Sequence, residues 1–585
     1  MMHEAWIIRR ALPLLLLTPF GSRAAVPVLE HLFPVAQQVG TTGIVAVVGK
    51  YEPWSALSLS NGPPKVWVDA PGLVFESTTN SGRFSVRVAA DAAPRAFLVR
   101  LYNDEGCSGA RYFITTRQPQ VAEVEPNDDF TKPQPITVLP ASINGRLEKS
   151  GDVDSFGVRL EAGQTLLASV EAYVLATPLD AVLRVVDARG TQVAWNHDDG
   201  RTLDPFVAFT AKAAGEYVVQ VFGFSYPADS EVRFTGNAKC VYRLHLFGGA
   251  YARYTVPLGV QRGAHEPLEV VGWNLARAGR SPDKFVFDAT ALTEGSSWTE
   301  WATESFQNRV RLPIGDGPEL VEQEPNDTLT NAVTIPCPVA VSGRIDRPGD
   351  IDRYRFSVKK GEEFLLAVQS AALGLGVDTW LRVDNDEGKE LKRAEDSGGM
   401  DPALEWTAAR DGDLYAVVGS LLHRGGPESW YRLSVRRAAP TIVPTVAAES
   451  FTVEAGKTNE VKLKVKLQHG AKGKFLAVAH DLPAGVRAAP VDVPEKGGDV
   501  TLLFEGAPDA KAFSGPFRLA VRNDADGRER NAVFEFVTSG ENNGVPNGFQ
   551  RLVREETDQL WLTVKQAKPA KSTNLVSTAG APAAK

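Results

Sequence analysis

The strongest constraint on the fold is that the chain contains two copies of one domain-sized sequence. The tetrapeptide Glu-Pro-Asn-Asp stands at residues 125–128 and again at 324–327. A Gly-Arg pair and then a Gly-Asp-x-Asp motif follow in the same order in both copies, the latter at residues 151–154 and 349–352. A repeat of this length indicates one folding unit that is used twice. Whatever fold the first copy adopts is therefore expected of the second.

A second, weaker repeat precedes each of these copies. Three pairs of residues align at one common offset: Pro34 with Pro257, Gln38 with Gln261, and Gly40 with Gly263. The order of modules is therefore A, B, A′, B′, and A′ is shorter than A. We place module A at residues 25–121, B at 122–248, A′ at 249–319 and B′ at 320–437.

The pattern of apolar residues predicts that each module is a β-sandwich. Residues 461–467 alternate valine or leucine with lysine, which sends one face of a strand into a core and the lysines into water. Segments 83–88 and 154–160 alternate in a similar way, and turn residues recur between such runs, as in antiparallel sandwiches. The predicted fold class is all-β, with tandem sandwich modules and a fifth, Ig-like module C at 438–566.

The two ends of the sequence are expected to lie outside the folded modules. Arg9 and Arg10 precede a short apolar run, and small residues follow at cleavage spacing, so residues 1–24 are predicted to be a signal peptide. We therefore expect a secreted, cell-surface or periplasmic protein, with no transmembrane segment in the mature chain. Residues 567–585, rich in Ala, Lys and Pro, are predicted to be disordered.

Charge and cysteine content exclude some partners and some frameworks. The formal net charge is −8, so nucleic acid is not expected as a partner. The three cysteines, Cys107, Cys240 and Cys337, lie far apart in the sequence. An odd number excludes complete pairing, and small buried hydrophobic residues are the favoured interpretation over a disulfide.

The order of motifs in modules B and B′ resembles the bacterial pre-peptidase C-terminal (PPC) domain. The motifs are Glu-x-Glu-Pro-Asn-Asp, Gly-Arg, Gly-Asp-x-Asp-x-Phe/Tyr, and then Ala-Gly-Gln or Lys-Gly-Glu. The resemblance implies a jelly-roll-like sandwich, appended to secreted peptidases and other exported proteins, that performs no catalysis itself. Its collagenase members bind calcium and collagen. Modules A and A′ resemble immunoglobulin-like TIG-type modules, and module C resembles Ig-like domains of exported bacterial proteins.

Each B copy carries a set of acidic and amide side chains that suits calcium. Calcium takes six to eight oxygen ligands, so a site needs several carboxylates and carbonyls in flexible loops. The candidate ligands are Glu123, Glu125, Asn127, Asp128, Asp152 and Asp154 in B, and Glu322, Glu324, Asn326, Asp327, Asp350 and Asp352 in B′. The resemblance implies ligands from this acidic loop and from the Asp-rich turn. The alternative is that these residues form turns and begin strands without a metal.

A second acidic loop follows in each B copy, but there the favoured interpretation is turn formation. Asn196 to Asp199 with Asp204 form it in B, and residues 394–397 with Asp401 keep part of the pattern in B′. His197 is the histidine with the most acidic neighbourhood in the sequence. A histidine beside aspartate is common on protein surfaces, so a metal or catalytic role for it is the less favoured alternative.

No catalytic motif was found, and the protein is predicted not to be an enzyme. The sequence has no G-x-S-x-G elbow, no H-E-x-x-H helix, no phosphate-binding P-loop and no G-x-G-x-x-G after a strand. The leading hypothesis is a calcium-stabilised adhesion protein that binds an extracellular protein or polysaccharide polymer. The alternatives are a calcium-independent structural or assembly protein, and an unrecognised secreted hydrolase or peptidase accessory protein.

Overall fold

The all-β prediction is confirmed by the computed structural model, which is a series of two-sheet sandwiches. The structure describes residues 25–54, 63–199, 202–230, 233–275, 284–292, 295–397, 401–536 and 552–566. Within these ranges the helical segments are two single turns of 3-10 helix, η1 (Tyr173–Leu175) and η2 (Ala371–Leu373). None of the described helices is long and apolar enough to cross a membrane. The predicted signal peptide and tail lie outside the described residues.

Modules B and B′ have the same strand order, that of a jelly roll. In B, the two sheets run β10-β12-β19-β14-β17 and β11-β13-β18-β15-β16. In B′, they run β26-β28-β35-β30-β33 and β27-β29-β34-β31-β32, which is the same order strand for strand. After the two short first strands, the other eight divide between the sheets as two Greek keys, with one hairpin, β15–β16 in B and β31–β32 in B′, within a single sheet. This is the jelly-roll arrangement.

The strands of B are β10 (Gln120–Ala122), β11 (Gln134–Pro135), β12 (Ala141–Arg146), β13 (Asp154–Leu160), β14 (Thr165–Glu171), β15 (Leu179–Asp187), β16 (Gln192–Asn196), β17 (Phe206–Thr210), β18 (Gly215–Ser225) and β19 (Val241–Phe247). Those of B′ are β26 (Glu319–Val321), β27 (Val333–Thr334), β28 (Val339–Arg344), β29 (Ile351–Val358), β30 (Glu363–Gln369), β31 (Thr379–Asp384), β32 (Glu390–Ala394), β33 (Ala403–Thr407), β34 (Gly412–Ser420) and β35 (Trp430–Arg437). The alternating segment 154–160 is strand β13, as the sequence predicted.

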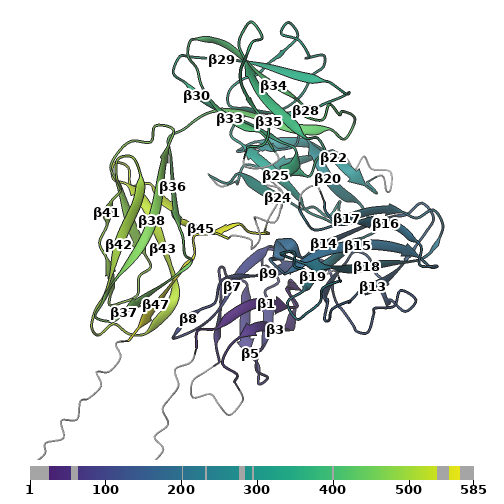
Figure 1. Ribbon diagram of the computed structural model, residues 1–585, viewed down its shortest axis with the longest axis vertical. Coiled ribbons are helices and arrows are strands. Elements are labelled where there is room, and N and C mark those ends of the chain that lie inside the picture. Colours follow the sequence, from purple (N-terminus) through teal and green to yellow (C-terminus); the bar gives the residue numbers. More distant parts are fainter. Residues whose placement is uncertain are drawn as a thin grey trace, which may run out of the picture.

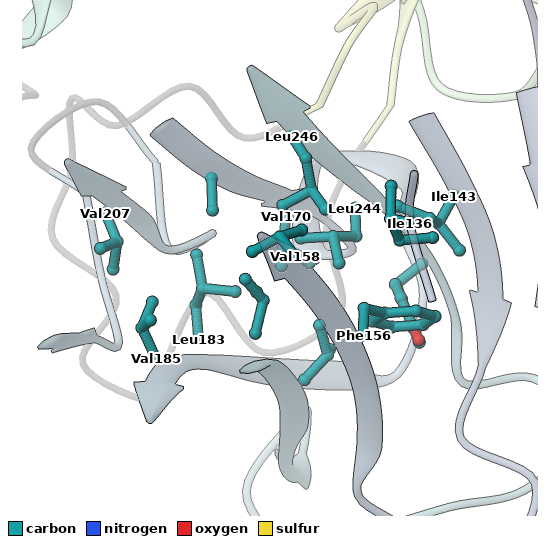
Figure 2. Packing of buried hydrophobic residues seen from close by; sticks show 14 of the residues in the cluster. Ile136, Ile143, Phe156, Val158, Val170, Leu183, Val185, Val207, Leu244 and Leu246 are labelled. Carbon is teal, nitrogen blue, oxygen red and sulfur yellow. The ribbon is translucent and has the colours of Figure 1, made fainter. Parts of the chain in front are cut away.

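The core of B lies between its two sheets (Figure 2). Phe156 and Val158 of β13 point inward from one sheet, and Ile143 and Leu244 meet them from the other. All four side chains are buried. Burial of one such side chain stabilises the folded state by roughly 1.5–3 kcal/mol relative to exposure. This core therefore fixes the two sheets relative to each other. It also fixes the position of the acidic loop, which lies at their edge.

Modules A and A′ are smaller sandwiches that share the β-strand arrangement only in part. The sheets of A have the orders β1-β3-β6-β5 and β2-β9-β7-β4, and those of A′ have the orders β20-β22-β23 and β21-β25-β24. The strands of A are β1 (Val28–Phe33), β2 (Ala36–Gln38), β3 (Thr42–Lys50), β4 (Lys65–Val68), β5 (Leu73–Ser77), β6 (Arg83–Val88), β7 (Ala96–Asn103), β8 (Gly106–Cys107) and β9 (Arg111–Thr116). Those of A′ are β20 (Tyr251–Val256), β21 (Val260–Gln261), β22 (His265–Trp273), β23 (Lys284–Asp288), β24 (Trp298–Trp301) and β25 (Val310–Gly315).

Module C is a sandwich of two larger sheets, in the orders β40-β42-β38-β36-β45-β46 and β37-β47-β43-β39-β41. Its strands are β36 (Thr441–Val446), β37 (Ser450–Glu454), β38 (Thr458–Gln468), β39 (Phe475–His480), β40 (Val486–Ala488), β41 (Val491–Asp492), β42 (Gly498–Gly506), β43 (Phe513–Asn523), β44 (Glu529–Asn531), β45 (Val533–Glu535), β46 (Glu556–Thr557) and β47 (Leu560–Lys565). The lysines of β38 are exposed and its alternate residues are buried, as predicted.

The modules are arranged in a ring, because module C returns to contact module A (Figure 1). Arg100 of β7 is fully buried and lies 2.7 Å from the carboxylate of Glu449 in module C. The rings of Trp67 and Trp561 pack edge to face, with their centroids 5.7 Å apart. Buried charge pairing and aromatic packing together make this a specific contact rather than a chance approach.

The 3-10 turns hold neighbouring modules together in the same way in both halves of the duplication. Residues 173–175 of η1 pack against Val35 and Ile114 of module A. Leu373 of η2 packs against Tyr254 and Leu258 of module A′. The three cysteines are free; Cys240 is buried, as expected, whereas Cys107 and Cys337 are partly exposed.

Candidate metal centres

In module B, the acidic loop and the Asp-rich turn meet at one end of the sandwich. The loop begins directly after β10, and Asp152 and Asp154 stand at the start of β13. The backbone N–H of Ser155 donates to the carbonyl oxygen of Asn127 at 3.1 Å, which joins the loop to the strand. Glu123, Glu125 and Asp154 have carboxylate oxygens within 4.8 Å of one another. The sequence-predicted residues of this copy are thus neighbours in space.

A tyrosine from the opposite side of the sandwich completes this cluster. The Tyr242 hydroxyl donates to Asp154 Oδ2 at 2.5 Å and contacts Glu123 Oε1 at 3.1 Å. Tyr242 stands opposite Gly145 in the β12–β19 pair, and a Cβ at Gly145 would lie 2.2 Å from the tyrosine Cζ. Only glycine leaves space for the ring, which explains the glycine of the Gly-Arg motif. Its neighbour Arg146 donates its backbone N–H to Glu123 Oε2 at 2.8 Å.

The most informative feature of the cluster is a set of buried oxygens without a hydrogen-bond donor among the described residues. They are Glu125 Oε1, Asn127 Oδ1, Asp152 Oδ1 and Asp154 Oδ1. The second carboxylate oxygens of the aspartates are satisfied, by the N–H of Glu148 and by Tyr242. A buried acceptor without a donor is unfavourable, and several of them together are more so. A cation held by Glu123, Glu125 and Asp154, whose carboxylate oxygens lie within 4.8 Å of one another, would compensate such acceptors.

The pKa values in module B show the same excess of negative charge. Burial raises the pKa of Asp154 to about 11, and the adjacent Glu123 carboxyl adds to this rise. Burial likewise raises the pKa of Asp152, to about 6, and that of Glu123. Without a positive ion, these carboxyls are therefore more stable when protonated. A bound cation would favour the ionised form.

Module B′ repeats this arrangement with its own six residues. Asn326, Asp350 and Asp352 are buried, and the Tyr431 hydroxyl donates to Asp352 Oδ2 at 2.5 Å. Here the oxygens without a donor among the described residues are Asn326 Oδ1, Asp327 Oδ1, Asp350 Oδ1 and Asp352 Oδ1. Two groups can hold a metal ion, Glu322 with Glu324 and Asp352, and Glu324 with Asp327 and Asp350. Burial raises the pKa of Asp352 to about 9 and that of Glu322 to about 8.

One basic side chain lies beside each cluster, and sequence reasoning missed it. Lys149 Nζ is 2.8 Å from Asp128 Oδ2 and 3.6 Å from Asp152 Oδ1. Arg347 occupies the equivalent position and lies 2.6 Å from Asp327 Oδ2 and 3.4 Å from Asp350 Oδ1. Both residues stand at the same place in the repeat, just before Gly-Asp. The recurrence of a basic residue at this position is the sequence feature that could have indicated that both residues lie beside the acidic clusters.

The second acidic loop forms turns, as predicted. Asp204 accepts backbone N–H groups of Ala172, Tyr173 and Val174 at 2.7–3.0 Å, so it fixes the start of η1. Asp401 accepts the three corresponding N–H groups before η2. His197 lies 3.0 Å from Asp180, and with Asp198 they form a partly exposed group. Asp180, His197 and Asp198 are all at least partly exposed to solvent, whereas the unsatisfied oxygens of the acidic clusters in B and B′ are buried.

A serine, a histidine and a glutamate form a chain of contacts in module B that sequence reasoning also missed. Ser142 Oγ lies 2.8 Å from His245 Nδ1, and His245 Nε2 lies 3.3 Å from Glu171 Oε2. A nucleophilic serine must reach its substrate and give its proton to the histidine. Ser142 is fully buried, and its single hydroxyl proton is directed to Gln118 Oε1 at 2.7 Å. Ser142 is therefore not placed as an accessible nucleophile, and the three side chains form a packed polar network.

Comparisons with known proteins give distant structural matches. No protein-family model and no curated protein match the sequence. The PPC domain of a Bacillus anthracis collagenase matches over 20% of this chain and 100% of its own length, with 17% identity and a TM-score of 0.16. A periplasmic inhibitor of g-type lysozyme from Aeromonas hydrophila matches over 20% of this chain and 95% of its own, with 17% identity and a TM-score of 0.14.

A Salmonella alpha-2-macroglobulin matches over 95% of this chain, with 10% identity and a TM-score of 0.14. The match spans 48% of the macroglobulin, so the chain corresponds to about half of that protein. At these scores the three comparisons assign the chain to no family.

Proposed function

We propose that this protein is an exported, non-catalytic binding protein whose B and B′ modules each bind calcium and present a surface for an extracellular polymer. The polymer is a protein or a polysaccharide. The calcium sites stiffen the ends of the jelly rolls, and modules A and A′ fix the spacing between them. The predicted signal peptide supports export.

The observation that carries the calcium proposal is the repeated set of unsatisfied oxygens. Each copy has four buried side-chain oxygens without a donor among the described residues, three from carboxylates and one from an asparagine. Calcium is the hard cation whose ligands are carboxylate and amide oxygens in irregular loops. The residues that would hold it are Glu125, Asn127, Asp152 and Asp154 in B, and Asn326, Asp327, Asp350 and Asp352 in B′.

Calorimetric titration of the chelator-treated protein with calcium tests this proposal. We expect two sites, one of which is lost in Asp152→Ala and one in Asp350→Ala. A matched control is Asp526→Ala, which removes a carboxylate from a turn of module C far from both clusters in the sequence. No heat and no shift of the melting temperature with calcium would overturn the calcium proposal.

The binding proposal has its own test, retention of the protein on insoluble polymers. We expect collagen, chitin or peptidoglycan to retain the protein in calcium and to release it in chelator. Retention that does not depend on calcium would favour a structural or assembly protein instead. Turnover of a peptidase or glycosidase substrate by the purified protein would contradict the non-catalytic part.

A further inference from the structure

A cavity of about 1040 Å³ lies where four modules meet a segment of the fifth. Its walls come from β9 of A, β14 and β19 of B, β24 and β25 of A′, and η2 of B′. Val553 and Arg554 of module C close it, and the N–H of Val553 donates to the carbonyl of Val174 at 3.0 Å. The cavity therefore exists only in the closed ring, and neither acidic cluster contributes to it.

The described residues that line this cavity include seven arginines and no lysine, although the whole chain has a net charge of −8. Arginine presents a planar fork of donors that matches carboxylate, sulfate and phosphate groups. Arginines from A, B, A′ and C all contribute, so the positive charge is a property of the assembled ring. The same wall carries five acidic residues, Glu171, Asp199, Asp204, Glu300 and Glu304, so arginines outnumber acids by seven to five. A concave wall on which positive charge prevails attracts anionic ligands.

Three of the five acidic residues of the wall are engaged by partners within the protein. Glu171 is paired with Arg243 at 2.5 Å, and Glu300 is paired with Arg309 at 2.8 Å. Asp204 is buried and accepts three backbone N–H groups. Asp199 and Glu304 also contribute carboxylates to the wall, which favours a ligand that is held by specific arginine contacts.

Several of the arginines keep binding capacity. Arg95 and Arg554 share a single carboxylate, that of Asp69. Arg117 and Arg311 are exposed and form no direct ion pair with a described residue, although Glu555 and Glu300 lie close enough to Arg311 to favour its charged form. Arg311 stacks on Trp298 at 4.2 Å, which fixes its guanidinium plane without occupying its donors. The donors of these two arginines are therefore not taken up by a direct carboxylate contact.

The two unpaired arginines lie on facing modules close to one junction. Gln118 of the A–B connection donates its side-chain N–H to the carbonyl oxygen of Gln307 in A′ at 2.8 Å. Arg117 is adjacent in sequence to Gln118, and Arg311 follows Gln307 by four residues on β25. Both arginines line the cavity that this junction borders.

We propose that this cavity binds a ligand with two or more oxyanion groups, carboxylate, sulfate or phosphate, and that Arg117 and Arg311 are its principal contacts. The site is independent of the calcium clusters. Because Arg554 belongs to the segment that closes the ring, the ligand also stabilises the contact between module C and modules A and B.

The test is calorimetric binding of three probes to the full chain in the presence of a calcium chelator. The probes are an oligogalacturonate for carboxylates, a heparin oligosaccharide for sulfates and tripolyphosphate for phosphates. We expect at least one to bind, and the double variant Arg117→Gln with Arg311→Gln to bind it at least tenfold more weakly. The matched control is Arg159→Gln with Arg410→Gln, which removes the same charge from side chains that are each 70% exposed outside the cavity.

The control should change affinity less than twofold. Equal losses in the two double variants would mean general attraction between charges and would overturn the proposal, as would the absence of binding by all three probes. Because chelator is present throughout, failure here leaves the calcium proposal unaffected, and failure of calcium binding leaves this one unaffected.

Discussion

Modules B and B′ share a fold and an acidic cluster, yet the outer faces of their first sheets differ. In B, Phe206 packs against Tyr251 and Trp273 of the following module, with ring centroids 5.7 and 5.5 Å apart. In B′, strand pairing places Ala403 at the equivalent position, and a groove of about 470 Å³ lies over the sheet.

This difference distinguishes residues that the PPC-like fold of both copies needs from residues that only one copy needs. The buried oxygens and the tyrosine beneath them occur in both copies, so they serve the module itself. The aromatic outer face occurs only in B, where it must hold module A′ in the ring. The predictions below test this separation.

The largest expected effect is the pH dependence of the calcium-free protein. The raised pKa values of Asp154, about 11, and Asp352, about 9, mean that protons bind more tightly to the folded than to the unfolded chain. This contribution to stability is complete below the unfolded pKa of roughly 4 and is lost progressively as pH rises from there to the folded values. Between pH 5 and 8 we expect a loss on the order of a few kcal/mol, measured by thermal melting in chelator.

Saturating calcium should reduce this pH dependence, since the ion keeps the carboxylates ionised. A melting temperature in chelator that is constant or rises from pH 5 to 8 would contradict the prediction. The measurement starts at pH 5 because Glu171, whose pKa is lowered by Arg243 and His245 despite its burial, acts with the opposite sign at lower pH.

The next effect is the stabilisation by calcium in each copy. At a hundredfold excess over Kd, one site contributes about 2.7 kcal/mol. Asp154→Asn should abolish that contribution in B and Asp352→Asn in B′, while each raises the stability of the calcium-free protein at neutral pH, because it removes a carboxyl that must take up a proton on folding. Chemical denaturation with and without calcium measures both. A variant that loses stability in chelator would show that the carboxylate is structural.

A smaller effect should distinguish the two outer faces. Phe206→Ala removes a half-buried ring from the contact between B and A′, and we expect a loss of about 2 kcal/mol in stability. The matched variant Ala403→Phe adds a ring over the groove of B′, which has no aromatic residue in its described lining. It should change the free energy of unfolding by less than about 0.5 kcal/mol. Similar losses from both substitutions, by denaturant unfolding, would remove the distinction.

The smallest effect concerns a tyrosine hydroxyl that the cluster of B′ has and the cluster of B lacks. Tyr354 stands where B has Phe156, and its hydroxyl lies 2.7 Å from that of Tyr431 and 3.2 Å from Glu322 Oε2. Tyr354→Phe should cost about 1 kcal/mol, because one buried hydrogen bond is lost. Calcium affinity should change little, since the four unsatisfied oxygens remain. A large loss of affinity in calorimetry would instead make the hydroxyl part of the site.

Local pattern and repetition were sufficient to predict the sandwiches and the candidate ligands. Strand β13 follows its alternation, and Asp152 and Asp154 lie beside the acidic loop because the motif order recurs. Sequence did not predict that Tyr242 lies beneath Asp154, because the two residues are 88 positions apart and stand on β19 and β13, which belong to different sheets that pack face to face. The sequence did not predict the closure of the ring either, because the contact between Trp67 and Trp561 joins distant modules and leaves no trace in the local pattern of apolar residues.

The closed ring also brings Ala25 and Lys565 to the same part of the molecule. The carbonyl of Ala25 accepts the side-chain N–H of Asn103 at 2.8 Å, and Lys565 lies 3.6 Å from Glu105. Both residues are therefore held at the turn between β7 and β8. A tether at either end would attach the ring at the same corner and leave modules A′ and B′ on the far side. A force applied between the two ends would act first on the contact between modules A and C. The contacts that connect A to C through B, A′ and B′ would bear little of this force.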